Sequence, residues 1–233
     1  MTDWSELLLI DKPHGITSFD VIRRLRRIYS DMHGGTKAPK LGHAGTLDPL
    51  ATGLMLLGVG PGTKKLAELI KLDKEYVAEV RLGESRTTGD MEGEVIDSYP
   101  VTVSGEQLRA DLLPVLARFP GTHTLPVSAY SAIKVDGVPM YKRARQAEIT
   151  KDTIIDIPMR QMTVYEAELL SVTVEGGYAV ATVRFAVASG TYVRSLAEEL
   201  GRQLGYPACL QNLRRTRVGE YRLEDAYQLD DLK

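Results

Sequence analysis

The sequence predicts an α+β fold whose sheet is mixed and mostly antiparallel. Three segments read as strands, because their hydrophobic residues alternate or run together: 75–82, 164–174 and 178–188. Two others have the spacing of amphipathic helices, 17–29 and 191–204. Strands and helices are mixed without the regular βαβ alternation of a parallel sheet, which favours an α+β arrangement flanked by helices and loops.

Several elements carry local signals for their limits. Thr17 and Asp20 have capping-box spacing at the start of the first helix, and Gly205 stops the last helix. In the strand at 75–82 the alternation places Tyr76 on the core side. The two long strands are joined as a hairpin through 175–177. We also expect a turn at 11–15, a polar loop at 31–40 and a short buried strand at 54–59. Two further helices are expected, at 63–71 with Thr63 as the N-cap, and at 105–118.

Composition limits the class of protein. A chain of 233 residues with 43% hydrophobic and 26% charged residues fits one large domain, or one domain with a small appendage. Its single cysteine, Cys209, excludes an intramolecular disulfide and fits a reducing compartment, so we expect a cytoplasmic protein. No apolar run approaches the ~20 residues of a transmembrane helix, so no membrane partner is expected. The net charge of −2 argues weakly against nucleic acid, although it does not say where the charges lie.

Two common chemistries have little support. The segment Gly58–Lys65 resembles a phosphate-binding loop, but it is one residue too short and Lys64 is followed by lysine. No pair of histidines has the spacing of metal ligands, and the one cysteine is isolated, so no metal is expected.

The densest motif is the segment Gly42–Gly53, GHAGTLDPLATG. Its three glycines predict a tight loop, and Pro49 biases Asp48 toward an extended conformation. Such a loop can present one carboxylate, from Asp48, and one imidazole, from His43. The alternative is that Asp48 only caps a short helix with Pro49 at its first position.

A second motif, at 188–197, places Arg194 in the first turn of a helix, where the helix dipole disfavours a cation. An arginine there needs an anion, either Glu198 one turn later or a carboxylate or phosphate from elsewhere. A small basic cluster follows at 213–217, for which a solvated surface is the simple explanation.

Taken together and in this order, these motifs resemble the TruB family of tRNA pseudouridine synthases. The resemblance covers roughly residues 7–219. It rests on six blocks: Leu8–Pro13 with Gly15–Ser18, the loop Gly42–Gly53, Lys74–Tyr76, Tyr130–Gly137, Gly190–Leu196 and Leu213–Arg215.

The resemblance implies the pseudouridine-synthase fold and isomerisation of the uridine at position 55 in the T-loop of tRNA. By the same resemblance Asp48 is the catalytic aspartate, and Arg194 pairs with it. Tyr76 stacks on the flipped base, with a further part in proton transfer. Tyr192 and Leu213 line the uracil pocket, and His43 helps to hold the RNA in its flipped-out form.

The resemblance further implies tRNA as the partner, no obligate protein partner, no metal and no cofactor, because the reaction is neither a redox reaction nor a group transfer. It leaves open whether Asp48 acts as a nucleophile or as a base. The alternative function is an RNA chaperone that refolds tRNA through the same cleft. A glycoside hydrolase is disfavoured, because hydrolysis usually needs two carboxylates and the sequence marks only one.

Two segments depart from the family pattern. An acidic turn that usually carries several aspartates reads Arg86–Asp90 here, and Leu125–Ser128 replaces the usual Gln-x-Pro-Pro. We expect both changes to affect RNA-contacting loops and neither to touch the catalytic residues. We also expect residues 1–233 to be the catalytic domain without the PUA-type C-terminal domain of many relatives. The basic clusters at 23–27, 64–65, 142–145 and 214–217 should form one cleft around Asp48, with acidic surface elsewhere.

Overall fold

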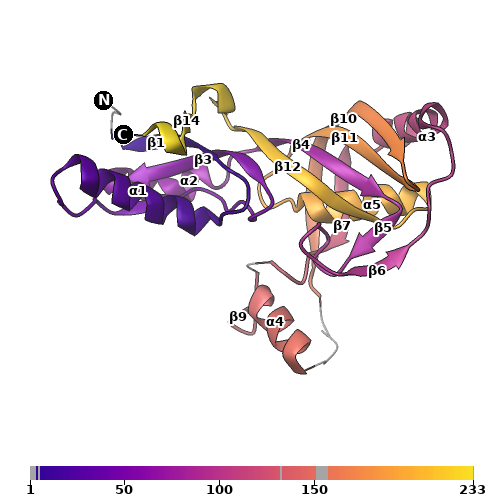
Figure 1. Cartoon of the computed structure of the whole chain (residues 1–233), viewed down its shortest axis with the longest axis horizontal. Helices are drawn as coiled ribbons and strands as arrows, with labels where there is room; N and C mark the ends of the chain where they lie inside the picture. The colour runs from indigo at the N-terminus through magenta and orange to yellow at the C-terminus, as the bar shows by residue number, and fades with distance from the viewer. Residues whose placement is uncertain (1–3, 5, 132, 151–156, 233) are drawn as a thin grey trace. The chain divides into compact units, whose positions relative to one another are not determined.

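The computed structural model of the chain describes residues 4, 6–131, 133–150 and 157–232 (Figure 1). The helices are α1 (Ser18–Met32), α2 (Leu66–Leu69), α3 (Gly105–Ala117), α4 (Met140–Thr150) and α5 (Val193–Leu204), with 3₁₀ turns η1 (Gly60–Lys65), η2 (Leu223–Asp225) and η3 (Leu229–Asp231). The strands are β1 (Leu7–Lys12), β2 (Leu41–His43), β3 (Thr52–Val59), β4 (Lys74–Leu82), β5 (Glu84–Arg86), β6 (Val95–Ser98), β7 (Gly121–Pro126), β8 (Lys134–Val135), β9 (Val138–Pro139), β10 (Met159–Glu175), β11 (Tyr178–Val187), β12 (Ala208–Val218), β13 (Tyr221–Arg222) and β14 (Tyr227–Gln228).

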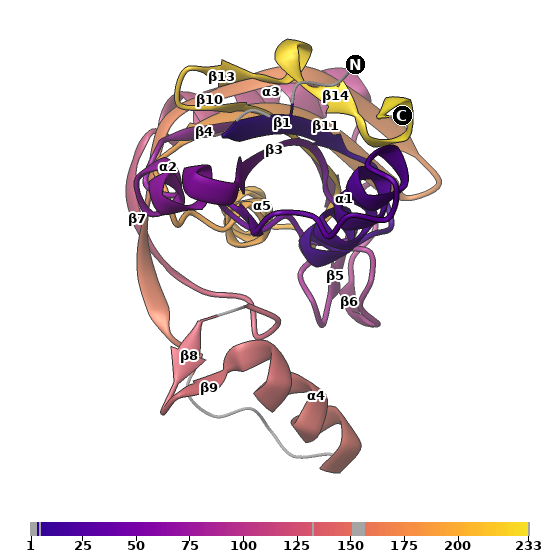
Figure 2. The ribbon, with the colours of Figure 1, turned by 90° about the vertical axis from the view of Figure 1, so that its left-hand side faces the viewer.

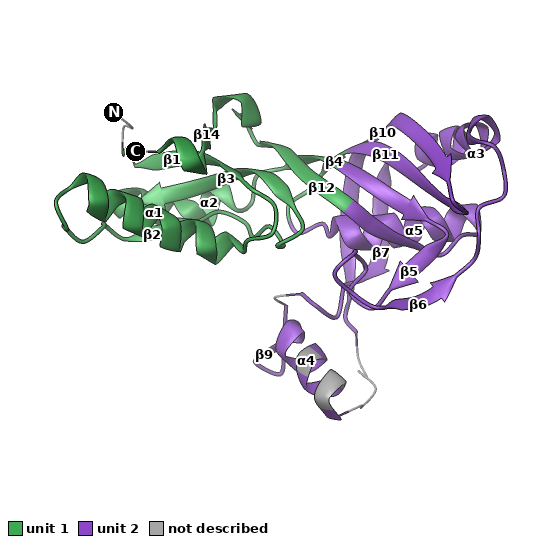
Figure 3. Cartoon of the chain, viewed as in Figure 1, with its two compact units in different colours: residues 1–77, 185–189, 212–233 green, residues 78–184, 190–211 purple. Residues whose placement is uncertain are grey.

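The chain divides into two compact units (Figure 3). Unit 1 comprises residues 1–77, 185–189 and 212–233, and unit 2 comprises residues 78–184 and 190–211. The strands β4, β11 and β12 each contribute residues to both units. The predicted extent of the catalytic domain stays a prediction.

Unit 1 is built on a mixed sheet with the neighbour order β14-β1-β3-β12. β1 and β3 are antiparallel, whereas β12 runs parallel to β3 and β14 parallel to β1. Figure 2 shows α1 and α2 on the same face of these strands. α1 buries Val21, Ile22 and Leu25, so the hydrophobic stripe of its first half is used in packing.

Unit 2 contains the longest strands. β10 is flanked by β11 and by β7, and it pairs with β7 in an antiparallel register in which Val164 faces Gly121. α3 packs on β10, and α5 packs against α3 and β7. β5 and β6 form a separate antiparallel pair, and the short pair β8–β9 leads into α4.

The predicted α+β class with a mostly antiparallel sheet is confirmed. Thr17 and Asp20 form the expected capping box of α1, which ends at Met32 rather than at residue 29. Tyr76 is on the buried face of β4 with 8% of its surface exposed. Gly205 ends α5 with a φ of 79°, a left-handed conformation that glycine adopts without strain.

Other predictions were wrong or incomplete. The helix expected at 63–71 is a 3₁₀ turn followed by the short α2, and Thr63 caps no helix, because its hydroxyl donates to Gly60 O at 2.8 Å within that turn. The sequence did not predict β7, α4 or β12. β12 was missed because its alternation is interrupted by arginines, which the structure shows to be paired or buried.

Candidate active site

The loop that follows β2 presents Asp48. Residues 44–51 bend between β2 and β3, and no helix follows Asp48, so the alternative in which this carboxylate only caps a helix is wrong. Ala51 N donates to the Asp48 backbone oxygen at 3.1 Å, which closes a tight turn around the half-buried aspartate. Ala44 N donates to Leu56 O at 2.9 Å and attaches the start of the loop to β3.

The N-terminal end of α1 holds the loop next to Asp48. The buried Ser18 hydroxyl donates to Leu47 O at 2.9 Å and accepts from Leu47 N at 2.8 Å. Gly15 N donates to Pro49 O at 2.9 Å. The residues on both sides of Asp48 are therefore fixed by hydrogen bonds from one short segment of chain.

Two buried cations hold the loop from inside unit 1. The Lys12 ammonium, 0% exposed, donates to Pro49 O at 3.2 Å and to Ala51 O at 2.6 Å. The Arg215 guanidinium, 1% exposed, donates to Leu54 O at 2.7 Å and to Gly45 O at 3.3 Å. Charge-assisted hydrogen bonds of this kind are about twice as strong as neutral ones, so the loop is held rigidly.

Sequence reasoning missed these loop-holding residues. Lys12 was assigned to a turn, Ser18 to a helix start and Arg215 to a surface cluster. Each of these side chains binds backbone atoms of the Asp48 loop, 29 to 170 residues away in the sequence. Backbone partners at such separations leave no pattern in a single sequence.

The basic cluster at 213–217 is not a solvated surface. Arg214 pairs with the Asp11 carboxylate at 2.6 and 3.2 Å, and Arg215 is buried. Arg217 Nη2 is 3.9 Å from Glu75 Oε2. These arginines hold β12 against neighbouring strands, so this cluster adds little free positive charge for RNA.

The electrostatics of the site favour a neutral imidazole at His43. Burial lowers the pKa of His43 below its usual 6.5, the nearby Arg215 cation lowers it further, and the Gly45 backbone opposes both. His43 ends β2, where it pairs with Leu57, directly before the Asp48 loop. At neutral pH this ring therefore offers one hydrogen-bond donor and one acceptor rather than a charge.

β12 lies between the strand that follows the Asp48 loop and the strand that carries Tyr76. On one side Thr52 Oγ1 donates to Leu213 O at 3.4 Å. On the other side Thr216 Oγ1 donates to Glu75 Oε1 at 2.8 Å, next to Tyr76. Unit 1 thus gathers four of the predicted site residues on neighbouring elements: His43, Asp48, Tyr76 and Leu213.

In unit 2, Arg194 is in the first turn of α5 as predicted and is buried. Its guanidinium donates to Thr88 O and Ser128 Oγ, both at 2.9 Å, and to Tyr130 O at 3.3 Å. Asp90 Oδ2 is 3.7 Å from Arg194 Nη1. Arg194 was expected to need an anion, and the buried Asp90 carboxylate supplies one. Asp90 lies 104 residues before Arg194 in the sequence.

The two segments that depart from the family pattern contribute these partners. Thr88 and Asp90 belong to one segment and Ser128 to the other. The expectation that neither departure touches the proposed catalytic set is therefore wrong for Arg194, whose own part in catalysis stays a prediction. Each segment supplies a backbone or side-chain acceptor that a buried guanidinium requires.

Tyr192 precedes α5 in the N-cap position and is half-buried. Tyr192 and Arg194 belong to unit 2, and Asp48 belongs to unit 1. The pairing of Arg194 with Asp48, and a common uracil pocket, stay predictions, as does the single basic cleft. The side chain of Arg145, in the predicted cluster 142–145, lies outside the described residues.

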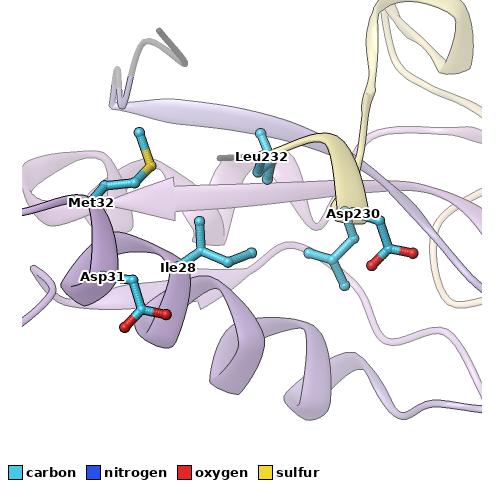
Figure 4. A pocket seen from close by; sticks show the side chains of 6 residues that line it. Ile28, Asp31, Met32, Asp230 and Leu232 are labelled. Atoms are coloured by element: carbon cyan, nitrogen blue, oxygen red, sulfur yellow. The ribbon is translucent and has the colours of Figure 1, made fainter.

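Unit 1 contains a pocket of about 430 Å³ (Figure 4). It is lined by Ile28, Asp31, Met32, Leu229, Asp230 and Leu232. The α1 residues that line it follow Ser18 by about three to four helical turns, so the pocket is separate from the Asp48 loop. Within the described ranges, no helix is long and apolar enough to cross a membrane, and no three His, Cys, Asp or Glu side chains group as metal ligands.

Comparison with protein families matches almost the whole chain. Residues 32–193 match the TruB family pseudouridylate synthase (N terminal domain), and residues 194–233 match the tRNA pseudouridylate synthase B C-terminal domain. The tRNA pseudouridine synthase B of Corynebacterium efficiens is 42% identical over 230 residues, which are 98% of this chain and 72% of that protein. The protein of the same name from Leifsonia xyli subsp. xyli is 42% identical over 229 residues, with the same coverage.

Solved structures give a similar result. An H/ACA RNP bound to a substrate RNA containing 2'-deoxyuridine has a chain that matches with a TM-score of 0.65 at 25% identity. An archaeal box H/ACA sRNP Nop10-Cbf5 complex matches with a TM-score of 0.62 at 26% identity. Each match covers 97% of this chain, which spans about half of the matched chains, 51% and 52%.

Proposed function

Because the chain belongs to the TruB family of pseudouridylate synthases, and is thereby an RNA-modifying isomerase with the predicted pseudouridine-synthase fold, we propose that it isomerises the uridine at position 55 in the T-loop of tRNA. The observation that carries the proposal is the Asp48 loop. Hydrogen bonds from Gly15, Ser18, Lys12 and Arg215 hold its backbone, as preorganised catalysis requires.

In this proposal a single carboxylate, that of Asp48, starts the reaction. The N-glycosidic bond breaks, the uracil turns, a bond forms between C5 and C1′, and the proton on C5 is lost while N1 gains one. The atoms of substrate and product are the same, so no oxidant and no group donor enter. Arg194 pairs with Asp48 and orients it, and a guanidinium partner favours the ionised carboxylate that this step needs.

The remaining site residues bind the base. Tyr76 stacks on the flipped uracil, and stacking on an aromatic ring is worth about 1–3 kcal/mol per base. Tyr192 and Leu213 line the pocket, and His43, neutral at pH 7, helps to hold the RNA in its flipped-out form. Together these contacts offset the few kcal/mol that extruding a stacked base costs.

The test is pseudouridine mapping in an unmodified tRNA transcript with the Asp48→Asn protein. We expect no pseudouridine at position 55 and nearly unchanged tRNA binding. Asp97→Asn, an exposed carboxylate on β6, is the matched control and should retain full activity. Turnover by Asp48→Asn, or modification by the unaltered protein outside the T-loop, would contradict the proposal.

The Asp48→Asn protein also distinguishes the proposed isomerase activity from the alternative function. If the protein acts as a tRNA chaperone through the same cleft, Asp48→Asn should still accelerate tRNA folding, because that activity needs binding without chemistry. Reactions with a chelator and without nucleotide test the expectation that no metal or cofactor takes part, which a requirement for either would overturn.

A further inference from the structure

The outer face of α1 carries a concentration of positive charge. The helix holds four arginines and two aspartates, a net charge of +2 in a chain whose total is −2. All four arginines are exposed: Arg23, Arg24, Arg26 and Arg27. Lys37 and Lys40, in the segment between α1 and β2, are also exposed.

Within this face, one line of side chains contains no acid, and the acid beside it, Asp20, pairs with one of its arginines, Arg23. Phe19, Arg23, Arg26 and Ser30 follow one another at spacings of four, three and four residues, which places them along one side of a helix. The line is about 16 Å long. Phe19 is 56% exposed, and the Arg23 guanidinium lies over its ring at 5.8 Å from the centroid. We call these four residues the α1 stripe.

The α1 stripe begins at the catalytic loop. Ser18, whose hydroxyl bonds Leu47 beside Asp48, directly precedes Phe19. The stripe then runs away from the loop toward the other end of α1, all within unit 1. A loop that acts on one nucleotide of a folded RNA necessarily has neighbouring nucleotides within this distance.

We propose that the α1 stripe is an RNA-binding surface that contacts the substrate beside the nucleotide being modified. Arg26 binds a backbone phosphate, Arg23 exchanges its Asp20 partner for a second phosphate, and Phe19 stacks on an unpaired base. This combination is typical of sequence-tolerant RNA binding. The inference rests on the proposed function for the identity of the RNA.

Two features favour RNA over an anionic membrane as the partner. The hydrophobic face of α1, with Val21, Ile22 and Leu25, is buried against unit 1, so it is not free to enter a lipid headgroup region. On the α1 stripe only Phe19 is a large hydrophobic side chain. One aromatic ring among cations suits base stacking better than membrane insertion.

The test measures binding of unmodified tRNA transcript over a range of salt concentrations. The Asp48→Asn protein is the background, so that turnover does not interfere. The double variant Arg23→Gln/Arg26→Gln should reduce the slope of log K against log salt by about 1.4 to 1.8, the value for two lost phosphate contacts. Phe19→Ala should weaken binding at least about fivefold. The matched control is Arg109→Gln, an exposed arginine on α3, which should leave the slope unchanged.

Equal slopes for the double variant and the control would overturn the inference, provided that thermal unfolding shows both to be folded. Vesicles containing phosphatidylserine form a second arm. Loss of vesicle binding in the double variant with an unchanged tRNA slope would assign the α1 stripe to a membrane instead. The proposed function fails by a different result, turnover by Asp48→Asn, so the two failures are distinguishable.

Discussion

Replacing Ser18 with alanine should weaken both folding and catalysis, because its one hydroxyl satisfies both backbone groups of Leu47. The donor bond to Leu47 O is 2.9 Å and the acceptor bond from Leu47 N is 2.8 Å, and both residues are buried. The variant leaves a buried N–H and a buried C=O without these partners. At about 1–3 kcal/mol for each of the two unsatisfied groups, we expect a loss of about 2–6 kcal/mol in the free energy of unfolding.

The effect on catalysis should be larger than on binding. Leu47 precedes Asp48, so loosening its backbone moves the carboxylate, and a displacement of about 1 Å can cost about 100-fold in rate. We expect kcat to fall about 10- to 100-fold, with KM for tRNA little changed, since the hydroxyl faces the loop interior and not the RNA.

Urea unfolding and steady-state pseudouridine formation measure the two effects. The matched control is Ser104→Ala, which removes a hydroxyl that caps α3 by accepting from Gln107 N at 3.1 Å. It should cost about 1 kcal/mol of stability and leave kcat unchanged. The reasoning is refuted if Ser18→Ala is destabilised as expected but keeps kcat within about twofold, because the hydroxyl would then stabilise the fold without placing Asp48.

Three further predictions follow from unit 1. Gly53→Ala should unfold the protein or destabilise it by more than about 3 kcal/mol, because a Cβ would lie 2.3 Å from Arg215 O at a φ of +102°. Differential scanning calorimetry measures the loss. The control is Gly176→Ala, at φ +61° in open space, which should cost only about 1–2 kcal/mol. Arg215→Gln should raise the pKa of His43, since the Arg215 cation helps to lower it. NMR titration of the imidazole measures this pKa, and an unchanged value in the variant would contradict the prediction. Burial lowers the pKa of Lys74 from 10.5 to about 8, so the folded state binds fewer protons than the unfolded chain between these values. The free energy of unfolding should therefore rise with pH between about 8 and 10.5, and Lys74→Met should lose this rise. Parallel pH profiles of stability for the unaltered protein and the variant would contradict this.

Local rules predicted the elements whose signals lie within a few residues. The capping box at Thr17, the alternation that buries Tyr76 and the glycine stop at Gly205 all depend on neighbours along the chain, and all are confirmed. The helix expected at 63–71 was wrong because a proline and glycines at its start favour a 3₁₀ turn over a regular first helical turn.

Local rules did not predict what depends on distant partners. Arg194 was expected to need an anion, but the sequence did not identify Asp90, which reaches it through the fold. Arg215 was read as a surface charge, because an arginine is rarely fully buried unless other groups accept its hydrogen bonds. Those acceptors, Gly45 O and Leu54 O, are backbone oxygens and leave no mark in the sequence.

The cations of unit 1 show why net charge was a poor guide to the partner. Arg214 is neutralised by Asp11, and Lys12 and Arg215 are buried on backbone carbonyls, so three positive charges maintain the structure and are not presented to RNA. Arg26, on α1, is exposed and lies on a line without acids. A total of −2 sums these two kinds of charge, although only the exposed kind attracts phosphate over distance. The exposed fraction of each cation, and not their number, is therefore the quantity from which RNA binding by this protein should be predicted.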